Sequence, residues 1–154
     1  MTRDVQLTRA GRSRLEATLT EEKRRLEDAT RILEEISASS DDYDDSGLED
    51  AKQEKARLEV RVDELEDQLS RAVLIEDHAR TQVDLGSLVT LKNGDEELRV
   101  QLVSTVEAVV AGEDVPRVSD ASPLGKALLG RKTGDAFEVN LGRRTANYTV
   151  VSIE

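Results

Sequence analysis

The stretch LEDAKQEKARLEVRVDELEDQLSRA, residues 48–72, decides the fold of the N-terminal half of the chain. Apolar or small residues recur in it at alternating steps of three and four, and one polar residue fills a position of the series. The full series is Leu48, Ala51, Lys55, Leu58, Val62, Leu65, Leu69 and Ala72. A heptad pattern sustained over more than three repeats is typical of a coiled-coil helix. We therefore predict a long helix here that packs along a second helix.

The preceding segment, residues 8–38, shows the same rhythm less regularly. Its series is Leu15, Leu19, Glu22, Leu26, Ala29, Leu33 and Ile36, and the glutamate predicts looser packing at that level. Roughly ten polar residues separate the two series, which is short enough to make the helices antiparallel neighbours. Thr8 can cap the first helix, although Gly11 stands where the acid of a capping box would lie, and Ser46 with Glu49 forms a capping box for the second. The pattern predicts a helical hairpin.

The connection between the helices, SSDDYDDSGLED at residues 39–50, gathers four aspartates within five positions: Asp41, Asp42, Asp44 and Asp45. One interpretation is a solvated loop that favours the positive end of the following helix dipole. However, the loop holds more carboxylates than capping requires, and like charges this close are costly unless a cation joins them. Clustered carboxylate oxygens suit Mg²⁺, so the loop could complete or distort a metal site on a partner. An EF-hand calcium loop is disfavoured because Gln53 stands where the bidentate glutamate is required.

The charge and composition exclude several classes of protein. The chain of 154 residues carries a formal net charge of −11, and residues 1–77 hold 13 Lys and Arg against 22 Asp and Glu. This acidity and the three aromatic residues, Tyr43, Phe137 and Tyr148, argue against strong direct binding of nucleic acid. Cysteine is absent, which excludes disulfides and thiolate metal sites. Neither a signal peptide nor a stretch long enough to span a bilayer is visible, so we expect a soluble, cytoplasmic protein.

A different pattern follows residue 77. Residues 78–84 carry no helical stripe and are interpreted as a linker, in which the lone histidine, His78, is expected to be a solvated surface residue. In residues 85–154, two alternating runs flank Asn93-Gly94, which is a hairpin signal. Ser122, Pro123 and Gly130 mark the cap, first turn and end of a short helix. AFEVN and NYTVVSI read as further strands. The prediction is an α+β domain with an antiparallel sheet and one short helix.

Three stretches resemble the bacterial Gre factors, which act on RNA polymerase. They are LTRAGRSRLEATL (residues 7–19), DAKQEKARLEVRVDELEDQLSRAVLIE (residues 50–76) and SDASPLGKALLGRKTGDAFEV (residues 119–139). The resemblance spans essentially the whole chain. It implies a two-domain α+β fold: a coiled-coil hairpin over residues 1–77 that enters the secondary channel of the polymerase, and an FKBP-like domain over residues 85–154 that docks at the channel rim. It also implies that the docking surface includes Asp120, Ser122 and Pro123.

The same resemblance gives the aspartate loop a role at the polymerase active centre. In Gre factors that promote RNA cleavage, an Asp and a Glu three residues later help to hold a catalytic Mg²⁺; these positions match Asp41 and Asp44. Here the Glu is a shorter Asp, the following Asn is Asp45, and Asp42 is added. A missing methylene can misplace an oxygen by about an ångström and lower the rate by orders of magnitude. The loop looks most like that of the subgroup of Gre homologues that inhibits the polymerase.

These observations lead us to expect a monomeric transcription inhibitor with no catalytic site and no cofactor of its own. All four aspartates are expected to engage the active-site Mg²⁺ of bacterial RNA polymerase or to obstruct substrate entry. Two alternatives remain. One is a factor that stimulates transcript cleavage, in which Asp41 and Asp44 manage the hydrolytic metal. The other is an FKBP-like prolyl isomerase or chaperone, whose aromatic pocket is hard to build from Phe137 and Tyr148 alone.

Overall fold

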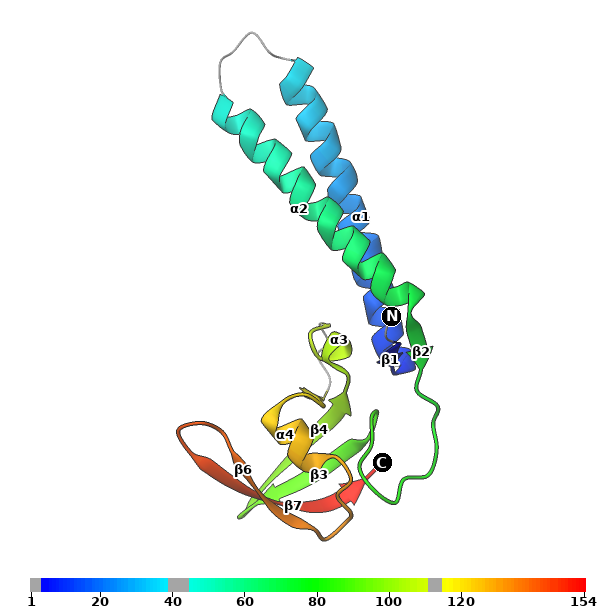
Figure 1. Cartoon of the computed structure of the whole chain (residues 1–154), viewed down its shortest axis with the longest axis vertical. Helices are drawn as coiled ribbons and strands as arrows, with labels where there is room; N and C mark the ends of the chain where they lie inside the picture. Colours follow the sequence, from blue (N-terminus) through cyan, green and yellow to red (C-terminus); the bar gives the residue numbers. More distant parts are fainter. Residues whose placement is uncertain (1–3, 39–44, 111–114) are drawn as a thin grey trace. The chain divides into compact units, whose positions relative to one another are not determined.

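Figure 1 shows a computed structural model of the chain, which describes residues 4–38, 45–110 and 115–154, and of residues 45 and 46 the backbone alone. The chain divides into two compact units. One comprises residues 15–70, and the other joins residues 1–14 to residues 71–154. This division differs from the predicted ranges 1–77, 78–84 and 85–154, because both ends of the helical hairpin sequence contact the C-terminal part of the chain. The units are described separately below.

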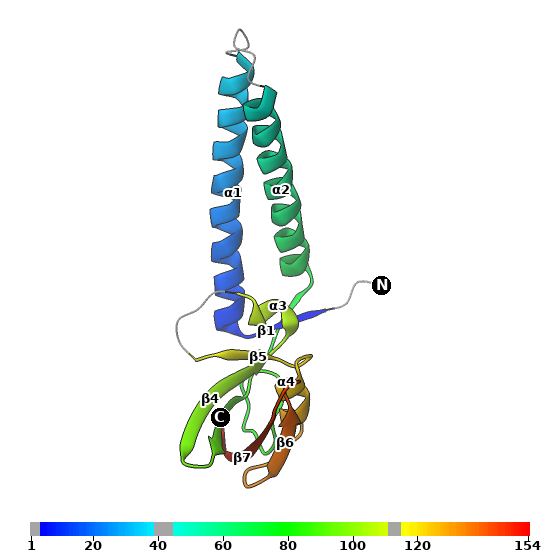
Figure 2. The same cartoon turned by 90° about the vertical axis from the view of Figure 1, so that its left-hand side faces the viewer.

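The first unit is an antiparallel helical hairpin. Helix α1 spans Arg9–Ala38 and helix α2 spans Asp45–Ser70, and the two lie side by side in both views (Figures 1 and 2). The heptad prediction is confirmed: Leu58, Val62 and Leu65 of α2 are buried, with exposed fractions of 1%, 6% and 0%. An ion pair of 3.2 Å joins Lys23 to Glu66 across the hairpin. The apolar stripe explains why the two helices pack against each other, and the exposed ion pair adds little to it.

Within this hairpin the packing is not uniform. Small residues, Ala29 of α1 and Ala51 of α2, face a groove of about 220 Å³ that Ile32 and Leu58 also line. Small side chains leave space between two helices at this level, since neither reaches far toward the opposite helix. Glu22, which interrupts the first series, keeps only 14% of its side chain exposed and pairs with Arg25 at 3.3 Å. The interrupting charge is therefore paired within its own helix.

In the second unit, two short strands that the sequence patterns did not predict pair where the hairpin sequence begins and ends. Strand β1, Val5–Leu7, runs parallel to strand β2, Ala72–Leu74. The pairing continues at both ends, because the Val5 N–H donates to the Arg71 carbonyl at 2.9 Å and the Ile75 N–H to the Leu7 carbonyl at 2.8 Å. Three-residue strands carry no readable alternation, so their partners have to be found through the structure.

The start of α1 is capped in two ways. The Thr8 hydroxyl accepts a hydrogen bond from the Gly11 N–H at 3.0 Å, as predicted for the cap. In a capping box, an acid at position 11 would accept from the Thr8 N–H in return. Glu107, which lies 99 residues away and is fully buried, does so instead: its carboxylate accepts from the Thr8 N–H at 2.7 Å and from the Thr8 hydroxyl at 2.6 Å. A Cβ at Gly11 would overlap that carboxylate, so glycine makes room for it.

A curled five-stranded sheet forms the main part of the second unit (Figure 2). Its strands are β3 (Leu88–Asn93), β4 (Glu96–Val103), β5 (Arg117–Ser119), β6 (Ala136–Asn140) and β7 (Thr145–Ile153), in the order β5-β4-β3-β7-β6. The predicted hairpin at Asn93-Gly94 is confirmed: Asn93 pairs with Glu96, and Gly94 has a φ of 62°.

The predicted antiparallel sheet is confirmed for the pairs β3–β4, β3–β7 and β6–β7, and two details differ from the prediction. Strand β5 runs parallel to β4, which makes the sheet mixed. Between them lies a second short helix, α3 (Thr105–Ala108), besides the predicted α4 (Pro123–Leu128). The chain turns through α3 after β4 and returns to the same edge of the sheet, and such a crossover allows parallel pairing. A four-residue helix and a three-residue strand are too short to leave a periodic signal.

The core of this unit is built from residues of the strands and of α4 and reaches into the segment predicted as a linker. Val83, 1% exposed, packs with apolar residues of the strands and α4. Its N–H donates to the Arg131 carbonyl, and its carbonyl accepts from the Gly130 N–H, each at 2.8 Å. Residues 78–84 are therefore anchored at Val83. Among the residues that the structure describes, no helix has the length and apolar character of a membrane span.

Candidate functional site

The aspartate loop joins the end of α1 to the start of α2. Asp41, Asp42 and Asp44 lie outside the described residues, and Asp45 is the first residue of α2, with its backbone alone described. Among the side chains that the structure describes, no three His, Asp or Glu residues converge as metal ligands. The aspartates of the loop are not among these side chains. The metal chemistry of the loop therefore stays a prediction.

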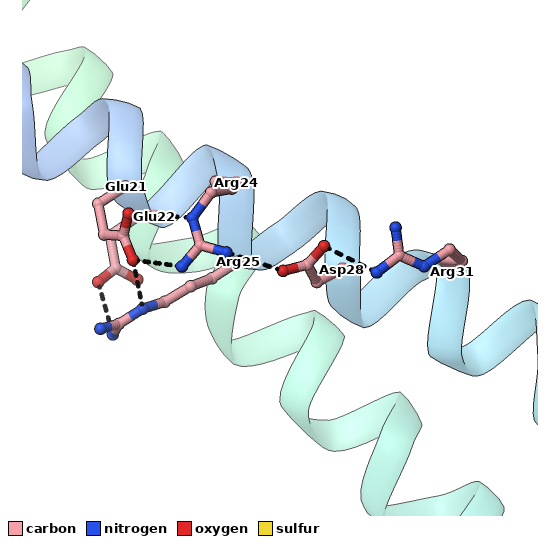
Figure 3. A network of polar contacts seen from close by, with 6 residues as sticks. All are labelled: Glu21, Glu22, Arg24, Arg25, Asp28 and Arg31. Carbon is pink, nitrogen blue, oxygen red and sulfur yellow. Dashed lines mark hydrogen bonds and ion pairs between the residues drawn. The ribbon is translucent and has the colours of Figure 1, made fainter.

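In the middle of α1, Arg24, Arg25 and Arg31 are paired with acids of the same helix (Figure 3). Arg24 contacts Glu21 at 2.6 Å and Asp28 at 3.0 Å, and Arg31 contacts Asp28 at 3.0 Å. The hydrogen bond from Arg24 is the main cause that lowers the pKa of Glu21. Such exposed pairs add little stability, but they neutralise the positive charge of these arginines. The arginines of this part of α1 therefore offer no free basic stripe to a phosphate backbone. The absence of strong direct binding to nucleic acid stays a prediction.

The three predicted docking residues come together in one turn between β5 and α4. Ser122 caps α4, since its hydroxyl accepts from the Gly125 N–H at 3.0 Å, and Pro123 occupies the first turn of the helix. Asp120 precedes them, and its N–H donates to the Val103 carbonyl of β4 at 2.9 Å. Asp120 and Ser122 are half-buried and Pro123 is exposed. The predicted cap is confirmed; the docking role is not tested by this geometry.

Sequence reasoning missed the residues that hold this turn, which we call the docking turn (residues 119–123). Ser119 is the last residue of β5, and its carbonyl accepts from the Ser122 hydroxyl at 2.6 Å. The Ser119 hydroxyl accepts from the Ala121 N–H at 3.0 Å and shares a 3.0 Å hydrogen bond with the Thr105 hydroxyl of α3. The signal for a turn was present as SDASP, but the partner on α3 is 14 residues away and could not be read from it.

A second polar network lies where the chain enters the sheet. His78 remains partly exposed, at 47% of its side chain, as predicted. An aspartate contacts it: Asp84 lies 2.7 Å from His78 Nε2 and also accepts from Arg80 Nε at 2.7 Å. Ser87 donates to Asp84 at 2.8 Å rather than to the imidazole. A nucleophile–base pair needs the hydroxyl on the imidazole, so this network is not arranged for acyl transfer.

Hydrogen bonds shift the pKa of both charged partners. The pKa of His78 is raised, first by its hydrogen bond to the Glu76 carbonyl at 2.9 Å and then by the one to Asp84. Partial burial on its own raises the pKa of Asp84. The combined hydrogen bonds from Arg80, Ser87 and His78 outweigh that effect and leave the pKa of Asp84 lowered. Both shifts favour the charged pair.

The two aromatic side chains of the sheet do not form an enclosed pocket. Phe137 is 7% exposed and belongs to the core, and its ring centroid lies 5.9 Å from that of Tyr148. Arg131 covers the Phe137 ring at 5.1 Å. The hollow of about 480 Å³ beside these rings is otherwise lined largely by polar or charged side chains, among them Lys92 and Asn147. A prolyl isomerase needs an apolar, aromatic-lined pocket, and this geometry does not favour one.

Comparison with known proteins covers both units. Residues 5–74 match the family model of the N-terminal domain of transcription elongation factors, and residues 78–154 match the model of the GreA/GreB C-terminal domain. The chain is 51% identical to the transcription inhibitor protein Gfh1 of Thermus aquaticus over 99% of this chain and 98% of the relative. It is 39% identical to the transcription elongation factor GreA of Syntrophomonas wolfei, over 99% of this chain and 97% of the relative.

A solved structure supports the same likeness. The crystal structure of GreA factor homolog 1 (Gfh1) of Thermus thermophilus is 50% identical, covers 99% of each chain and superposes with a TM-score of 0.50. The names of these relatives describe transcription factors and not enzymes. The comparisons therefore agree with an architecture that mixes helix and sheet.

Proposed function

The chain belongs to the GreA/GreB family of transcription elongation factors, and from this premise we propose that it binds bacterial RNA polymerase and inhibits RNA synthesis and transcript cleavage. The observation that carries the proposal is the 51% identity, over 99% of the chain, to a protein named as a transcription inhibitor. The GreA relative reported above is less similar, at 39% identity.

In the proposed mechanism, the hairpin enters the secondary channel and brings the aspartate loop to the active centre. A helix of 30 residues, such as α1, extends about 45 Å at 1.5 Å per residue, which is long enough to reach into a deep channel. Asp41, Asp42, Asp44 and Asp45 supply carboxylate oxygens, the donor type that Mg²⁺ prefers, and the metal belongs to the polymerase. Their charge also repels incoming triphosphates.

The docking turn is assigned the second contact with the polymerase. Asp120 and Pro123 are presented by β5 and by the first turn of α4, and Ser122 fixes the helix start. Rigid elements on both sides hold a short recognition segment in one conformation, which lowers the entropy cost of binding. The hairpin unit thus acts on the reaction, and the docking turn retains the factor on the enzyme.

The alternative is stimulation of transcript cleavage, which the 39% identity to a GreA protein keeps open. In that case Asp41 and Asp44 would position the hydrolytic metal. We favour inhibition because Asp44 is one methylene shorter than the Glu of cleavage factors, and an error of about an ångström in the position of a metal ligand is costly for catalysis.

The test uses a stalled, backtracked elongation complex of the cognate polymerase with Mg²⁺, in which RNA 3′-end cleavage and nucleotide addition are both followed. Slower addition without added cleavage supports inhibition, whereas faster cleavage supports the alternative. A tip variant with Asp41, Asp42, Asp44 and Asp45 replaced by alanine is expected to lose inhibition and keep binding. Full inhibition by this variant would mean that occupancy of the channel, and not the tip charge, is the mechanism.

A matched control separates the tip charge from the total charge. The control variant replaces four exposed acids of the second unit by alanine and therefore removes the same formal charge; they are Asp95, Glu96, Glu97 and Glu138. This variant is expected to inhibit as the unaltered protein does. Loss of inhibition in both variants would indicate an effect of net charge.

A further inference from the structure

Ser119 is the residue at which the hydrogen bonds of the docking turn converge. Its carbonyl oxygen accepts from the Ser122 N–H at 3.0 Å and from the Ser122 hydroxyl at 2.6 Å. The Ser122 hydroxyl in turn accepts from the Gly125 N–H at 3.0 Å. One carbonyl therefore fixes both the backbone and the side chain of Ser122, the residue that caps α4.

Close approach of α4 to this carbonyl explains a glycine. A Cβ built on Gly125 would overlap the Ser119 carbonyl group, and it would also lie 3.0 Å from the Asp120 Cα. The carbonyl oxygen and carbon of Ser119 are backbone atoms, so no side chain can move aside to make room. Gly125 is buried there, and α4 starts directly after the turn.

The Ser119 side chain adds a link that the backbone does not supply. Its hydroxyl accepts from the Ala121 N–H at 3.0 Å, which fixes the residue between Asp120 and Ser122. It also shares a 3.0 Å hydrogen bond with the Thr105 hydroxyl of α3, where either group can donate. A hydroxyl that accepts from Ala121 keeps its own proton free to donate to Thr105. The side chain thus ties the docking turn to a second element.

From these contacts we propose that Ser119, supported by Thr105, is a positioning residue for docking on RNA polymerase. Ser119 itself makes no contact with the partner in this proposal; it holds Asp120, Ser122 and Pro123 in the conformation that binds. The inference rests on the proposed function, since it names the residues that shape the surface assigned to docking. It predicts that affinity falls when the hydroxyl is removed, although no contact group is lost.

The experiment titrates full-length variants against the elongation complex and separates half-maximal concentration from maximal inhibition. Ser119→Ala is expected to raise the half-maximal concentration about three- to tenfold, the effect of one or two modest hydrogen bonds, with the same maximal inhibition. Thr105→Val is expected to raise it about twofold, because only the link to α3 is lost. Ser119→Thr, which keeps the hydroxyl, is expected to restore the original value.

Hydrogen exchange gives an independent readout in the free protein. Ser119→Ala is expected to speed exchange of the Ala121 amide, which loses its acceptor, and to leave the Val100 amide of β4 unchanged. Val139→Ala serves as a control for general destabilisation, since Val139 is buried at 3% exposure in β6, away from the turn. All variants are compared at a temperature at which each of them is folded. If Val139→Ala leaves the half-maximal inhibitory concentration unchanged while Ser119→Ala raises it, the result supports a positioning role for Ser119.

The outcomes separate this inference from the proposed function. If Asp120→Ala weakens binding and Ser119→Ala does not, positioning by Ser119 is wrong and the docking surface stands. If neither Asp120→Ala nor Pro123→Ala weakens binding, the assigned docking surface is wrong, and the inference falls with it. If Val139→Ala weakens binding as much as Ser119→Ala, the effect is one of stability and the inference is overturned.

Discussion

Glu107 is a charged side chain with no exposure to solvent, and its surroundings explain why that is tolerated. Its two carboxylate oxygens accept from the N–H and the hydroxyl of Thr8. The site lies at the N-terminus of α1, where the helix dipole favours negative charge. Ser104 caps the short helix that carries Glu107 and also donates to the Gln6 carbonyl at 2.7 Å. A residue of α3 thereby completes a cap that the local sequence around Gly11 leaves incomplete.

A double-mutant cycle at Gly11 and Glu107 tests this cap. Glu107→Ala is expected to lower the free energy of unfolding by about 2–4 kcal/mol, because a hydrogen bond to a charged group is lost and the Thr8 N–H is left without an acceptor. Gly11→Ala alone is expected to cost about 1–3 kcal/mol through overlap with the carboxylate. In the Glu107→Ala background, the same change should stabilise by up to about 1 kcal/mol, the helix preference of alanine. Urea denaturation measures all three, and additive losses would contradict the shared site.

His78 adds a contribution that depends on pH. Its pKa is raised in the folded state by the hydrogen bonds to the Glu76 carbonyl and to Asp84. The positive charge of the nearby Arg80 acts in the other direction and lowers this pKa. Because the folded pKa is raised, the charged imidazole stabilises the folded protein. This stabilisation is complete at a pH below the unfolded pKa of about 6.5, and it is lost as the pH rises through the folded pKa. His78→Gln is therefore expected to be less stable than the unaltered protein at pH 5.5 and closely similar to it at pH 9. Urea denaturation across this range measures the difference, and a difference independent of pH would exclude the imidazole charge as its cause.

At the scale of the element, the regular helices were predictable and the short strands were not. Leu58, Val62 and Leu65 follow a period that the sequence repeats, and Ser122 and Pro123 mark the start of α4 by local chemistry. Strands β1 (residues 5–7), β2 (residues 72–74) and β5 each have three residues. A strand this short shows no period in the sequence. The Glu107 cap joins residues 99 apart, and its one local trace was a glycine where an acid was expected. Asp120, Ser122 and Pro123 were named from the resemblance, and their docking role stays a prediction. Ser119 and Thr105 could not be linked without the crossover that brings α3 to β5.

The hairpin allows a paired test of the heptad on one helix. Leu58 is 1% exposed and Val60 is 58% exposed, two residues apart on α2. Leu58→Ala is expected to lower the free energy of unfolding by about 2–5 kcal/mol, since it removes buried methyl groups and leaves a cavity. Val60→Ala is expected to change it by about 0.5 kcal/mol or less. Urea denaturation, monitored by the helical signal in circular dichroism, measures the free energy of unfolding of both variants. An equal loss of stability in the two variants would contradict the assigned buried face.

At the scale of the whole molecule, charge and apolar packing are distributed differently along the chain. Residues 1–77 hold 22 of the 33 acidic residues, including those of the aspartate loop. The sheet unit has a contiguous apolar core around Val89, Leu91 and Leu102, and it carries the docking turn. A factor that must be retained by one surface and act through another needs both parts in one chain. In the proposed mechanism, altering one part should therefore change how tightly the factor binds, and altering the other should change what it does when bound.

Competition between variants tests this separation in full-length protein. The tip variant, with Asp41, Asp42, Asp44 and Asp45 replaced by alanine, keeps the docking turn, so about a tenfold excess is expected to relieve inhibition by the unaltered protein, as mass action predicts for a shared site. Adding Asp120→Ala to the tip variant should abolish this relief, because the competitor no longer docks. The control variant at Asp95, Glu96, Glu97 and Glu138 should give no relief, since it inhibits by itself. Nucleotide addition by the elongation complex is the measurement. If the tip variant and its Asp120→Ala derivative relieve inhibition equally, docking does not depend on Asp120. If neither relieves inhibition, the tip is needed for binding as well as for inhibition.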